Sequence, residues 1–539
     1  MTIEELKHLK ESEDKAEFKE AKENFPWNGG SHRKQKDRRK CYLGYIVALA
    51  NEGGGYLILG MADKEPHQVV GSDFAKGEIG ALEDAVYEKL QIRVHIEELF
   101  DENGLRVVLT TIPSRPIGKT LKFEGVPLMR TGDSLRNMSD EEIFKILSEQ
   151  EPDFSAKICS GLTLEDIDND ATVVFKEKYA LKQNNESFKS LDTEQALSDV
   201  GLITDKGITY AALILLGTEK AIKKHLPNTQ VNIEYRQTLA QTHFDKREIF
   251  VNPLFIAIDE IWKYLNLRNS DNKISEGPYK FDLPYFNEEV IREAVLNAIA
   301  HRDYTITSEI VIKQYTDRIT ILNPGGFPKG VTKDNLITVS STPRSRLLTE
   351  ILEKTGLVER SGQGVDKIYR ITLSEGKAWP DYSKTDFYQV ELNINGKVVD
   401  SAFASFIKEE QDKRGVYDKL GAFEIIALYR IKEGQSSLVK AEILELLEEA
   451  NLINQSGDNY LISKRYNEIL EQIEGSDEDK IIEYVKANAP VRMGDIVELF
   501  ANRLTRRQVN NIVYKLVKEG KLESEGNGRY TSYSIKENE

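Results

Sequence analysis

The sequence predicts a multidomain α+β protein, and three observations lead to this expectation. The chain has 539 residues, which is more than one hydrophobic core usually organises. Residues 1–150 combine an apolar helix with short strands and glycine turns, whereas amphipathic helices dominate from about Gly415 onward. Between these parts, a long apolar helix is followed by a strand pair that ends at glycines. The expected divisions are 1–150, a mixed connector at 151–270, 271–397, a helical unit at 398–475, and 476–539.

Composition narrows the function classes. Hydrophobic residues make up 40% and charged residues 30%, as in a globular protein, and no apolar run is long enough to cross a membrane. Cys41 and Cys159 are too few for a disulfide framework and too isolated for a thiolate zinc site, so we expect a cytoplasmic protein. The net charge of −16 means that any nucleic-acid binding depends on local basic patches.

The N-terminal segment carries acids in a pattern that can serve metal chemistry. Glu11 and Glu17 precede Lys19, and Asp63 follows an apolar strand at 56–60. If the fold gathers these acids, their charges repel unless a divalent cation lies between them, and such a site can activate water against a phosphodiester. The alternative is an acidic, helix-prone N-terminus together with a solvated turn aspartate.

The neighbouring motifs identify a family resemblance. Glu-Phe-Lys at 17–19, a helix that ends in Ala-Asn, the turn Gly53-Gly54-Gly55, the strand at 56–60 and the segment 126–143 follow one another in order. This order resembles the Schlafen AlbA-type domain over residues 1–150. The resemblance implies a Schlafen-type α/β core. It also implies that two glutamates and an aspartate, here Glu11, Glu17 and Asp63, bind Mg²⁺ or Mn²⁺ and cleave structured RNA such as tRNA, with Lys19 beside them.

The spacing of the two glutamates departs from the family pattern. The gap from Glu11 to Glu17 is one residue longer than is usual in the family. On a strand, one extra residue turns the side chain to the opposite face unless a bulge absorbs it. Glu11 is therefore the least secure of the three acids, and Glu13 is an alternative.

A basic patch precedes the apolar helix at 42–50. Phosphate contacts supply most of the affinity for nucleic acid, so cations beside an acidic metal site suit a polyanionic substrate. The alternative is a solvated helix start. Trp27, in the preceding loop, either stacks on a base or packs under that loop. The nucleic-acid-binding candidates in this part of the chain are Arg33, Lys34, Arg38, Arg39 and Arg130.

A second site is expected on the helix at 286–304. The chain has no Gly-x4-Gly-Lys-Ser/Thr loop, but Glu293, Asn297 and His301 recur every four residues and so share one helix face. Most of the other positions are apolar, and buried polar groups need partners. Magnesium-bound nucleotide is one such partner, and a structural hydrogen bond between helices is the other.

Glycine turns follow that helix. A hairpin ends in Asn323, Pro324, Gly325 and Gly326, and Gly362 and Gly364 stand where a later helix begins. Bare amides at a helix N-terminus favour an anion.

In this order, residues 280–375 resemble the GHKL ATP-binding fold of gyrase and histidine kinases, an α/β sandwich, in the divergent form found with Schlafen-type domains. The resemblance places the water-activating base at Glu293, the magnesium ligand at Asn297 and a phosphate-contacting lid near Arg344. Asn323 falls where the family has an acid that recognises adenine, and an amide carbonyl accepts a hydrogen bond less strongly than a carboxylate does. ATP is therefore the expected cofactor, and such modules often dimerise, so a homo-oligomer is expected. Residues 207–217 resemble the middle part of proteins labelled RecG-like or HTH-containing predicted regulators.

The C-terminal segment reads as a winged helix. Helices at 479–485, 493–500 and 504–518 precede an alternating hairpin at 520–535. Arg506, Arg507, Gln508 and Asn510 open the third helix, where base contacts usually arise. DNA or RNA reading and protein docking both remain open for this unit, and residues 422–470 can form another unit of the same type.

Two functions follow from these features. The first is an ATP-regulated, metal-dependent endonuclease that acts on RNA and serves as a conditional toxin or antiviral effector. The second is an ATP-responsive transcriptional regulator that binds DNA without cutting it. The first explains why Glu17, Lys19 and Asp63 occur together, because acids that face phosphates give a pure DNA binder no advantage.

Overall fold

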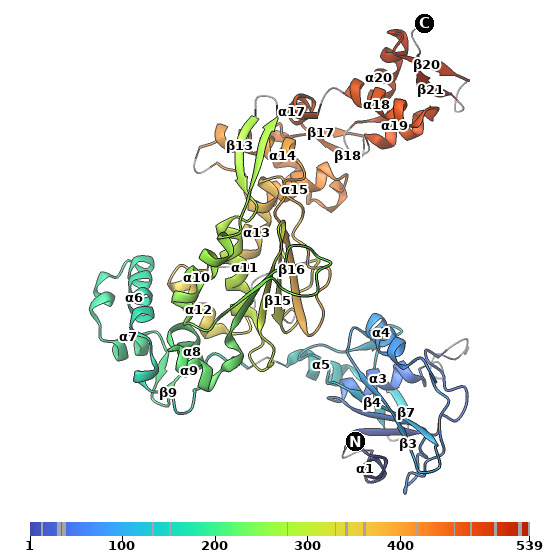
Figure 1. Ribbon diagram of the computed structural model, residues 1–539, viewed down its shortest axis with the longest axis vertical. Helices are drawn as coiled ribbons and strands as arrows, with labels where there is room; N and C mark the ends of the chain where they lie inside the picture. The colour runs from blue at the N-terminus through green and yellow to red at the C-terminus, as the bar shows by residue number, and fades with distance from the viewer. Residues whose placement is uncertain are drawn as a thin grey trace. The chain divides into compact units, whose positions relative to one another are not determined.

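The computed structural model confirms a multidomain α+β fold (Figure 1). It describes residues 1–11, 14–29, 34, 39–131, 134–149, 152–276, 279–328, 330–339, 343–358, 363–415, 418–457, 459–474, 477–500, 504–526 and 531–536. The chain forms two compact units. The N-terminal unit comprises Met1–Asp153, Gly325–Gly330 and Asp386–Gln389, and the second unit contains the rest.

The N-terminal unit is built on a four-stranded sheet in the order β1-β2-β4-β3. β1 pairs in parallel with β2, and the other pairs are antiparallel. Leu57 and Leu59 of β2 face a core shared with α3 and α4, whereas Ile58 faces the opposite core with Phe18 and with Leu6 of α1. This alternation gives the sheet helices on both faces. The elements are α1 (Ile3–Lys7), β1 (Ala16–Lys19), α3 (Tyr42–Asn51), β2 (Gly55–Leu59), α4 (Ile79–Leu90), β3 (His95–Phe100) and β4 (Arg106–Ile112).

The glycine turn between α3 and β2 brings β2 against β1. Gly53, Gly54 and Gly55 have φ angles of +101°, +87° and +153°, which side chains rarely adopt. A Cβ on Gly55 would also overlap the carbonyl oxygen of Lys15, just before β1. The turn therefore requires glycine for both its conformation and its close approach.

A second, three-stranded sheet in the order β5-β6-β7 completes the N-terminal unit. The Asn51 side chain ties the end of α3 to this sheet, because its amide donates to the carbonyls of Leu121 and Leu128 at 3.0 Å each. α5 begins with a capping box between Ser139 and Glu142. The elements are β5 (Lys122–Phe123), β6 (Val126–Thr131), β7 (Ser134–Asn137) and α5 (Asp140–Ser148).

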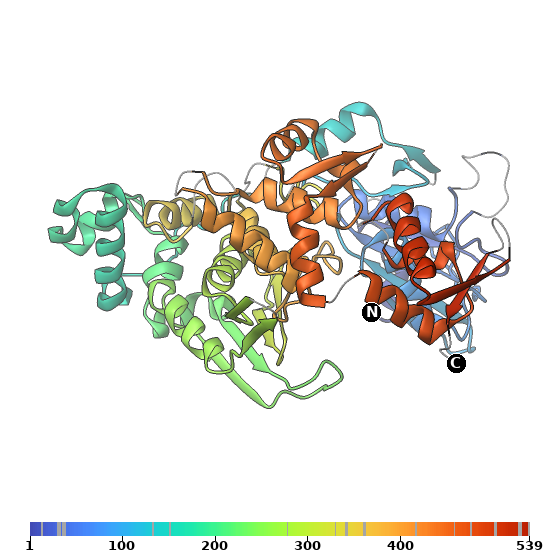
Figure 2. The ribbon, with the colours of Figure 1, turned by 90° about the horizontal axis from the view of Figure 1, so that it is seen from above.

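The second unit contains a five-stranded sheet in the order β11-β10-β14-β15-β16. Helices pack on one of its faces, where Ile233, Ile312 and Ile321 lie in their core. Figure 2 shows the ribbon, including the helices of this unit, turned by 90°. The sheet draws β10 and β11 from before residue 271. The elements are β10 (Val231–Tyr235), β11 (Lys246–Phe250), α10 (Leu254–Asn266), β12 (Asp271–Glu276), β13 (Tyr279–Pro284), α11 (Glu288–His301), β14 (Ile310–Gln314), β15 (Arg318–Pro324), α12 (Arg346–Lys354), α13 (Gln363–Ser374) and β16 (Gln389–Asn395).

The segment before this sheet is helical and shares its core. Phe175 of α6 and Leu213 of α8 are fully buried in it. Thr209 caps α8, whose apolar residues correspond to the run recognised in the sequence. The elements are η1 (Leu164–Asp166), α6 (Asn169–Gln183), η2 (Glu186–Ser190), α7 (Thr193–Asp199), β8 (Ile203–Thr204), β9 (Gly207–Ile208), α8 (Tyr210–Leu216), α9 (Glu219–His225) and η3 (Pro227–Thr229).

Downstream of β16, a helical segment packs against α13. Tyr369 and Leu373 of α13 lie in one core with Phe403 of α14 and Ile425 of α15. Three helices and a hairpin follow one another here, the order typical of a winged helix. The elements are α14 (Ser401–Lys413), α15 (Ala422–Lys432), η5 (Ser436–Leu438), α16 (Ala441–Glu449), β17 (Ile453–Ser456), β18 (Asn459–Ile462) and α17 (Lys464–Glu474).

The last segment has its own core around Ile481, Val509 and Val513. Its strands form a sheet in the order β19-β21-β20, and its elements again follow the winged-helix order. None of the helices in the described part of the chain combines the length and apolar character that crossing a bilayer requires. The elements are α18 (Asp477–Asn488), β19 (Val491–Arg492), α19 (Met493–Leu499), α20 (Arg506–Lys518), β20 (Leu522–Glu525) and β21 (Ser532–Ile535).

Candidate functional site

Strand β1 places Glu17 and Lys19 on one face of the sheet. Its neighbours Ala16 and Phe18 point into the opposite core, so the period of two turns Glu17 and Lys19 toward α3. The Glu17 side chain is only 1% exposed. A buried carboxylate is costly unless cations pair with it.

Two cations meet the Glu17 carboxylate. Lys19 Nζ lies 2.9 Å from Glu17 Oε1, and Arg130 Nη1 lies 3.0 Å from Oε2. Arg130 also pairs with Glu52, with 2.8 Å between Nη2 and Oε2. Apart from this 2.9 Å ion pair with Lys19, the buried Glu17 Oε1 accepts no hydrogen bond from the described residues. Arg130, a predicted nucleic-acid contact, is thus engaged by carboxylates.

Lys19 links Glu17 to Asp63. Its ammonium lies 3.2 Å from Asp63 Oδ2 and 5.4 Å from the centre of the Tyr45 ring. Burial disfavours the charged ammonium, but the combined interactions with Glu17, Tyr45 and Asp63 outweigh it, and the pKa of Lys19 is raised. Asp63 is 48% exposed, so this end of the cluster is open to solvent. The structure therefore brings together three of the predicted catalytic residues.

Glu11 lies beside the free edge of β1. Its Oε1 accepts a hydrogen bond from the backbone N–H of Phe18 at 3.2 Å. Arg130 Nη1 donates to the neighbouring carbonyl of Ala16 at 2.6 Å. Because β1 begins only at Ala16, the longer spacing between Glu11 and Glu17 does not shift the strand register. Glu13 lies outside the described residues.

The cluster has the donor type of a divalent-cation site, although it gathers only two of the predicted acids, Glu17 and Asp63. Glu17 and Asp63 offer hard oxygen ligands, one of them a buried oxygen with spare acceptor capacity, and an ammonium already bridges them. Three carboxylates, including Glu52, face two cations, which leaves one negative charge. Within the described ranges no group of three or more His, Cys, Asp or Glu stands ready as a metal site.

The cluster borders a cavity of about 480 Å³. Lys19, Asp63 and Lys64 line it, together with Glu20, Ala21, Phe25 and Ala62. The lining of the cavity therefore combines two lysines with two carboxylates.

The basic patch before α3 is only partly described. Lys34 is exposed, whereas Arg39 is 6% exposed and donates to Asn137 Oδ1 at 2.6 Å. Arg33 and Arg38 lie outside the described residues. Arg39 thus secures the start of α3 in this structure.

The predicted nucleotide face of α11 is formed as expected from its spacing. Glu293 is 3% exposed and accepts from Asn297 Nδ2 at 3.2 Å. α13 packs against α11, and a Cβ on Gly364 would overlap Glu293 Oε1. Gly364 therefore gives the Glu293 carboxylate its space at the start of α13. Gly362 lies outside the described residues.

His301 and Asn323 supply further polar atoms in the second unit. Burial, and then the nearby charge of Arg344, lower the pKa of His301 to about 4, so the ring is neutral at neutral pH. Arg344 Nη1 donates to the His301 carbonyl at 3.2 Å. His301 Nδ1 and Asn323 Oδ1 are buried without a hydrogen-bond partner in the described part of the chain. Buried polar atoms of this kind commonly meet a ligand or water.

Gly325 and Gly326 use their backbone N–H groups within the N-terminal unit. The Gly325 N–H donates to the Tyr388 carbonyl at 2.7 Å, and the Gly326 N–H donates to the Phe387 carbonyl at 3.0 Å. These amides are engaged in this structure, so anion binding there remains a prediction.

Two further polar residues beside these clusters were not predicted from the sequence. Asp366, in the first turn of α13, has a buried Oδ1 without a hydrogen bond from the described residues, and burial raises its pKa to about 6. Glu52 completes the clamp on Arg130. Asp366 stands two residues after Gly364, and Glu52 stands just before the glycine turn, so proximity to those glycines was the available signal.

Helix α20 presents part of the predicted nucleic-acid-binding set. Arg506, Arg507 and Asn510 are exposed. Gln508 instead forms a capping box with Thr505, whose N–H and hydroxyl donate to Gln508 Oε1 at 2.8 and 2.7 Å. The basic start of the helix is thus open to a ligand, while the Gln508 amide oxygen is occupied.

Three family models match parts of the chain. Residues 13–139 match "Schlafen, AlbA_2", residues 307–392 match "Putative ATP-dependent DNA helicase recG C-terminal", an HATPase-type model, and residues 142–232 match "Domain of unknown function (DUF8451)". The chain therefore joins a Schlafen AlbA-type domain to an ATPase-like domain, as the motifs predicted. The solved structure of the DIP2311 protein from Corynebacterium diphtheriae is similar, with a TM-score of 0.49, 20% identity, and coverage of 85% of this chain and 94% of that chain. No curated protein matches.

Proposed function

We propose that this chain, a Schlafen AlbA-type domain joined to an ATPase-like domain, is an ATP-dependent protein that acts on nucleic acid. The N-terminal unit is a metal-dependent endonuclease, and RNA of tRNA-like structure is its favoured substrate. Recognition of the Schlafen AlbA_2 and HATPase-type models supports this assignment at the level of domains. The role of a conditional toxin or antiviral effector follows from domain analogy alone.

One observation carries the nuclease proposal: Lys19 bridges Glu17 and Asp63 beside a cavity. The pair with the buried Glu17 stabilises the fold, but the second pair, with the half-exposed Asp63, adds little stability, because solvent-facing ion pairs contribute roughly 0–1 kcal/mol. The arrangement does suit a site in which cations are exchanged. Glu17 and Asp63, with Glu11 as the third predicted ligand, would hold Mg²⁺ or Mn²⁺, which would polarise a phosphate and activate a water when bound.

In the same proposal, two lysine side chains bind the phosphate of the substrate. Lys19 and Lys64 line one cavity, and ammonium groups bind phosphate oxygens as point charges. Lys19, released from one carboxylate, orients a phosphate and offsets charge that builds up on it.

The second unit binds ATP in this proposal. Asn297 holds the nucleotide's magnesium, Glu293 orients water, and the buried acceptor of Asn323 meets the adenine amino group. Glu293 and Asn297 already contact each other at 3.2 Å, and Asn323 Oδ1 is buried without a hydrogen-bond partner from the described residues. Binding of ATP sets the activity and the assembly of a homo-oligomer.

A second candidate function is an ATP-responsive regulator that binds DNA without cutting it. The specific observation in its favour is that both oxygens of Glu17 already face cations, so that this buried carboxylate is paired without metal. The basic start of α20 gives such a regulator a DNA-reading helix.

The deciding experiment is cleavage of purified total tRNA and of duplex DNA by the full chain. Each is incubated with Mg²⁺ or Mn²⁺, with and without ATP, beside an Asp63→Asn variant and an Asp84→Asn control. Asp84 is exposed on α4 and does not line the cavity beside Lys19. Cleavage by the wild type and the control, lost in Asp63→Asn, supports the nuclease. Absence of cleavage by the wild type in every condition, with DNA retained in a gel shift, supports the regulator.

ATP binding has an independent test. Calorimetric titration of the full chain with Mg-ATP should give a binding isotherm that Asn297→Ala removes, while Asn266→Ala, an exposed position on α10, leaves it unchanged. Equal affinity in Asn297→Ala and the wild type would show that α11 is not the nucleotide helix.

A further inference from the structure

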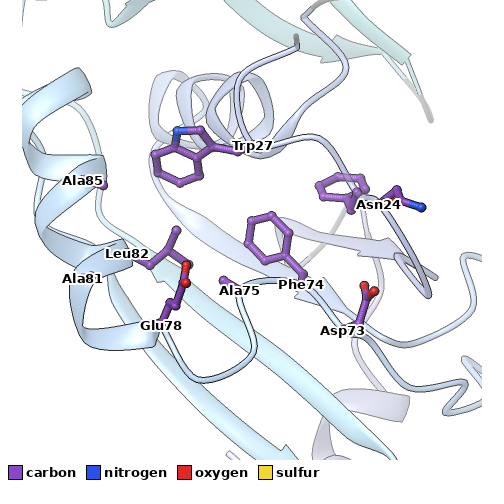
Figure 3. Close-up of a pocket in the computed structure, with 10 residues that line it drawn as sticks. Asn24, Trp27, Asp73, Phe74, Ala75, Glu78, Ala81, Leu82 and Ala85 are labelled. Carbon is purple, nitrogen blue, oxygen red and sulfur yellow. The ribbon is translucent and has the colours of Figure 1, made fainter.

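A second cavity in the N-terminal unit, of about 490 Å³, has aromatic walls (Figure 3). Trp27, Phe74 and Leu82 line it, and the carboxylates of Asp73 and Glu78 stand at its edge. We propose that this cavity takes one unpaired nucleobase that carries an exocyclic amino group. The proposal rests on the proposed function, since it names how the same domain recognises its nucleic acid.

The aromatic walls are held in place before any ligand arrives. Trp27 stacks on Tyr42 with 5.5 Å between ring centres, and Phe25 meets Phe74 edge-on at 5.8 Å. The Tyr42 hydroxyl is hydrogen-bonded to Thr110 at 2.7 Å. Base–aromatic stacking contributes most when the aromatic side chain is already ordered, because little conformational entropy is then lost.

The loops that carry these side chains are tied to the core. Carbonyls of Pro26 and Trp27 accept from the first N–H groups of α3, at 2.9 and 3.2 Å. The Ser72 hydroxyl donates to the Ala21 carbonyl at 2.7 Å. The buried guanidinium of Arg106 donates to the carbonyls of Ser72 and Phe74 at 3.0 and 2.8 Å. The cavity is therefore a fixed feature of the domain, of a size that small ligands occupy.

The polar rim selects among bases. Asp73 and Glu78 are exposed carboxylates that only accept hydrogen bonds, and Glu78 makes no cap bond at the start of α4. Cytosine, adenine and guanine offer amino groups to such acceptors, as carboxylates accept from the cytosine amine in base readout. The exocyclic positions of uracil carry carbonyl oxygens alone, which a carboxylate repels.

The aromatic cavity is continuous with the cation-lined cavity. Phe25 lines both the aromatic cavity and the cavity of Lys19, Asp63 and Lys64. A base stacked in the first cavity therefore has its neighbouring phosphate next to the second. The acidic rim alone would also suit an arginine-bearing peptide, but such a peptide brings no phosphate to Lys19 and Lys64 in the neighbouring cavity.

The test measures binding in a chain whose cleavage is blocked by Asp63→Asn. Hexamers of rC, rA and rU are titrated in this background, and in the same background with Trp27→Ala, Trp27→Phe, or Asp73→Asn with Glu78→Gln. We expect rC and rA to bind about tenfold tighter than rU. Trp27→Ala should weaken rC binding about tenfold, Trp27→Phe much less, and the double amide variant should remove the preference for rC over rU.

Several outcomes are decisive. Hexamer binding that is independent of base and of Trp27 would overturn the base pocket, although the nuclease proposal would stand if wild-type cleavage persists. Binding of an arginine-rich peptide that Trp27→Ala abolishes, without any effect of Trp27 on the hexamers, would also overturn it. If Trp27→Ala unfolds, as thermal melting would reveal, the comparison of Trp27→Phe with the double amide variant still decides. Absence of both tRNA cleavage and hexamer binding would instead count against the proposed function itself.

Discussion

Lys19 is the residue on which the N-terminal site depends most. It stands between a carboxylate that is almost fully buried and one that is half exposed, so it couples the interior of the domain to its cavity. An internal ammonium can hold a metal site together before metal arrives, because it screens carboxylates that would otherwise repel each other.

Replacing Lys19 by methionine should expose this role. Lys19→Met leaves Glu17 with Arg130 alone, and we expect a loss of roughly 1–3 kcal/mol in the stability of the N-terminal unit. Mn²⁺ should restore part of the lost thermal stability, because a divalent cation can then occupy the place of the ammonium. Scanning calorimetry of the full chain measures both effects. Lys22→Met, at an exposed lysine in the same segment, is the control. It should show neither the loss of stability nor the stabilisation by Mn²⁺.

Mn²⁺ should not restore thermal stability when Asp63→Asn is added to Lys19→Met. Equal Mn²⁺ stabilisation in the single and double variants would mean that the ion binds elsewhere.

Asp366 gives a prediction with a defined pH window. Burial raises its folded-state pKa to about 6, above the unfolded value of about 3.9, so the folded chain binds the proton more tightly. The free energy of unfolding of the nucleotide-free protein therefore falls as pH rises from about 4 to about 6, and it stays reduced above pH 6. Asp366→Asn should stabilise the chain at pH 8, by about 1 kcal/mol once partial exposure is allowed for, and have little effect at pH 4.

Thermal melts across this pH range, with exposed Asp334→Asn as the control, test the assignment. If Asp366→Asn stabilised the chain as much at pH 4 as at pH 8, ionisation of Asp366 would not be the cause of the stabilisation.

At the scale of elements, the sequence predicted what depends on local pattern. Glu17 and Lys19 share a face because a strand alternates, and Glu293 meets Asn297 because a helix repeats. The pairing of Arg130 with Glu17 and Glu52 was not predictable, because it joins segments that are distant in sequence. The concern about Glu11 assumed that it belongs to the strand, whereas the strand begins later.

The start of α13 should be intolerant of a side chain. Gly364→Ala places a methyl group where the Glu293 carboxylate lies, so we expect Mg-ATP binding to be lost or weakened by at least tenfold. Gly494→Ala in α19 meets open space and should leave binding unchanged. Calorimetric titration of both variants checks this, and unaltered affinity in Gly364→Ala would place the nucleotide elsewhere.

Helix α20 should contribute electrostatically to nucleic-acid binding. Arg506→Ala with Arg507→Ala removes two exposed cations, so affinity should fall and the slope of log K against log salt should become shallower by about two. The control pair is Lys223→Ala with Lys224→Ala on α9, which removes the same charge. A gel shift across salt concentrations measures the slope, and equal slopes in both pairs would indicate a protein-docking role for α20.

At the scale of the whole molecule, the sequence predicted the multidomain architecture but not which segments contribute strands to each sheet. The multidomain α+β architecture followed from length and motif order, and two of its domains match family models. The sheet of the ATPase-like region nevertheless takes β10 and β11 from the preceding segment, and β10 pairs in parallel with the distant β14. Such pairing depends on tertiary contacts that no local pattern encodes.

Nucleotide binding should change hydrogen exchange in helices beyond the nucleotide site. We expect Mg-ATP to slow hydrogen exchange in α14 and α15 as well as in α11 and α13, because α13 packs against both groups of helices. Exchange measured by mass spectrometry on the wild type and on Asn297→Ala provides the comparison. Protection confined to α11 and α13 would show that nucleotide binding is not coupled to α14 and α15.

Helix α13 belongs to two cores at once. Ile368 lies in the core of the five-stranded sheet, while its neighbour Tyr369 lies in the core of the downstream helices. The helix cannot shift as a rigid body without repacking both. Binding at either end is therefore thermodynamically reciprocal: a ligand of the downstream helices that displaces α13 must change the affinity for nucleotide by the same factor as nucleotide changes the affinity for that ligand.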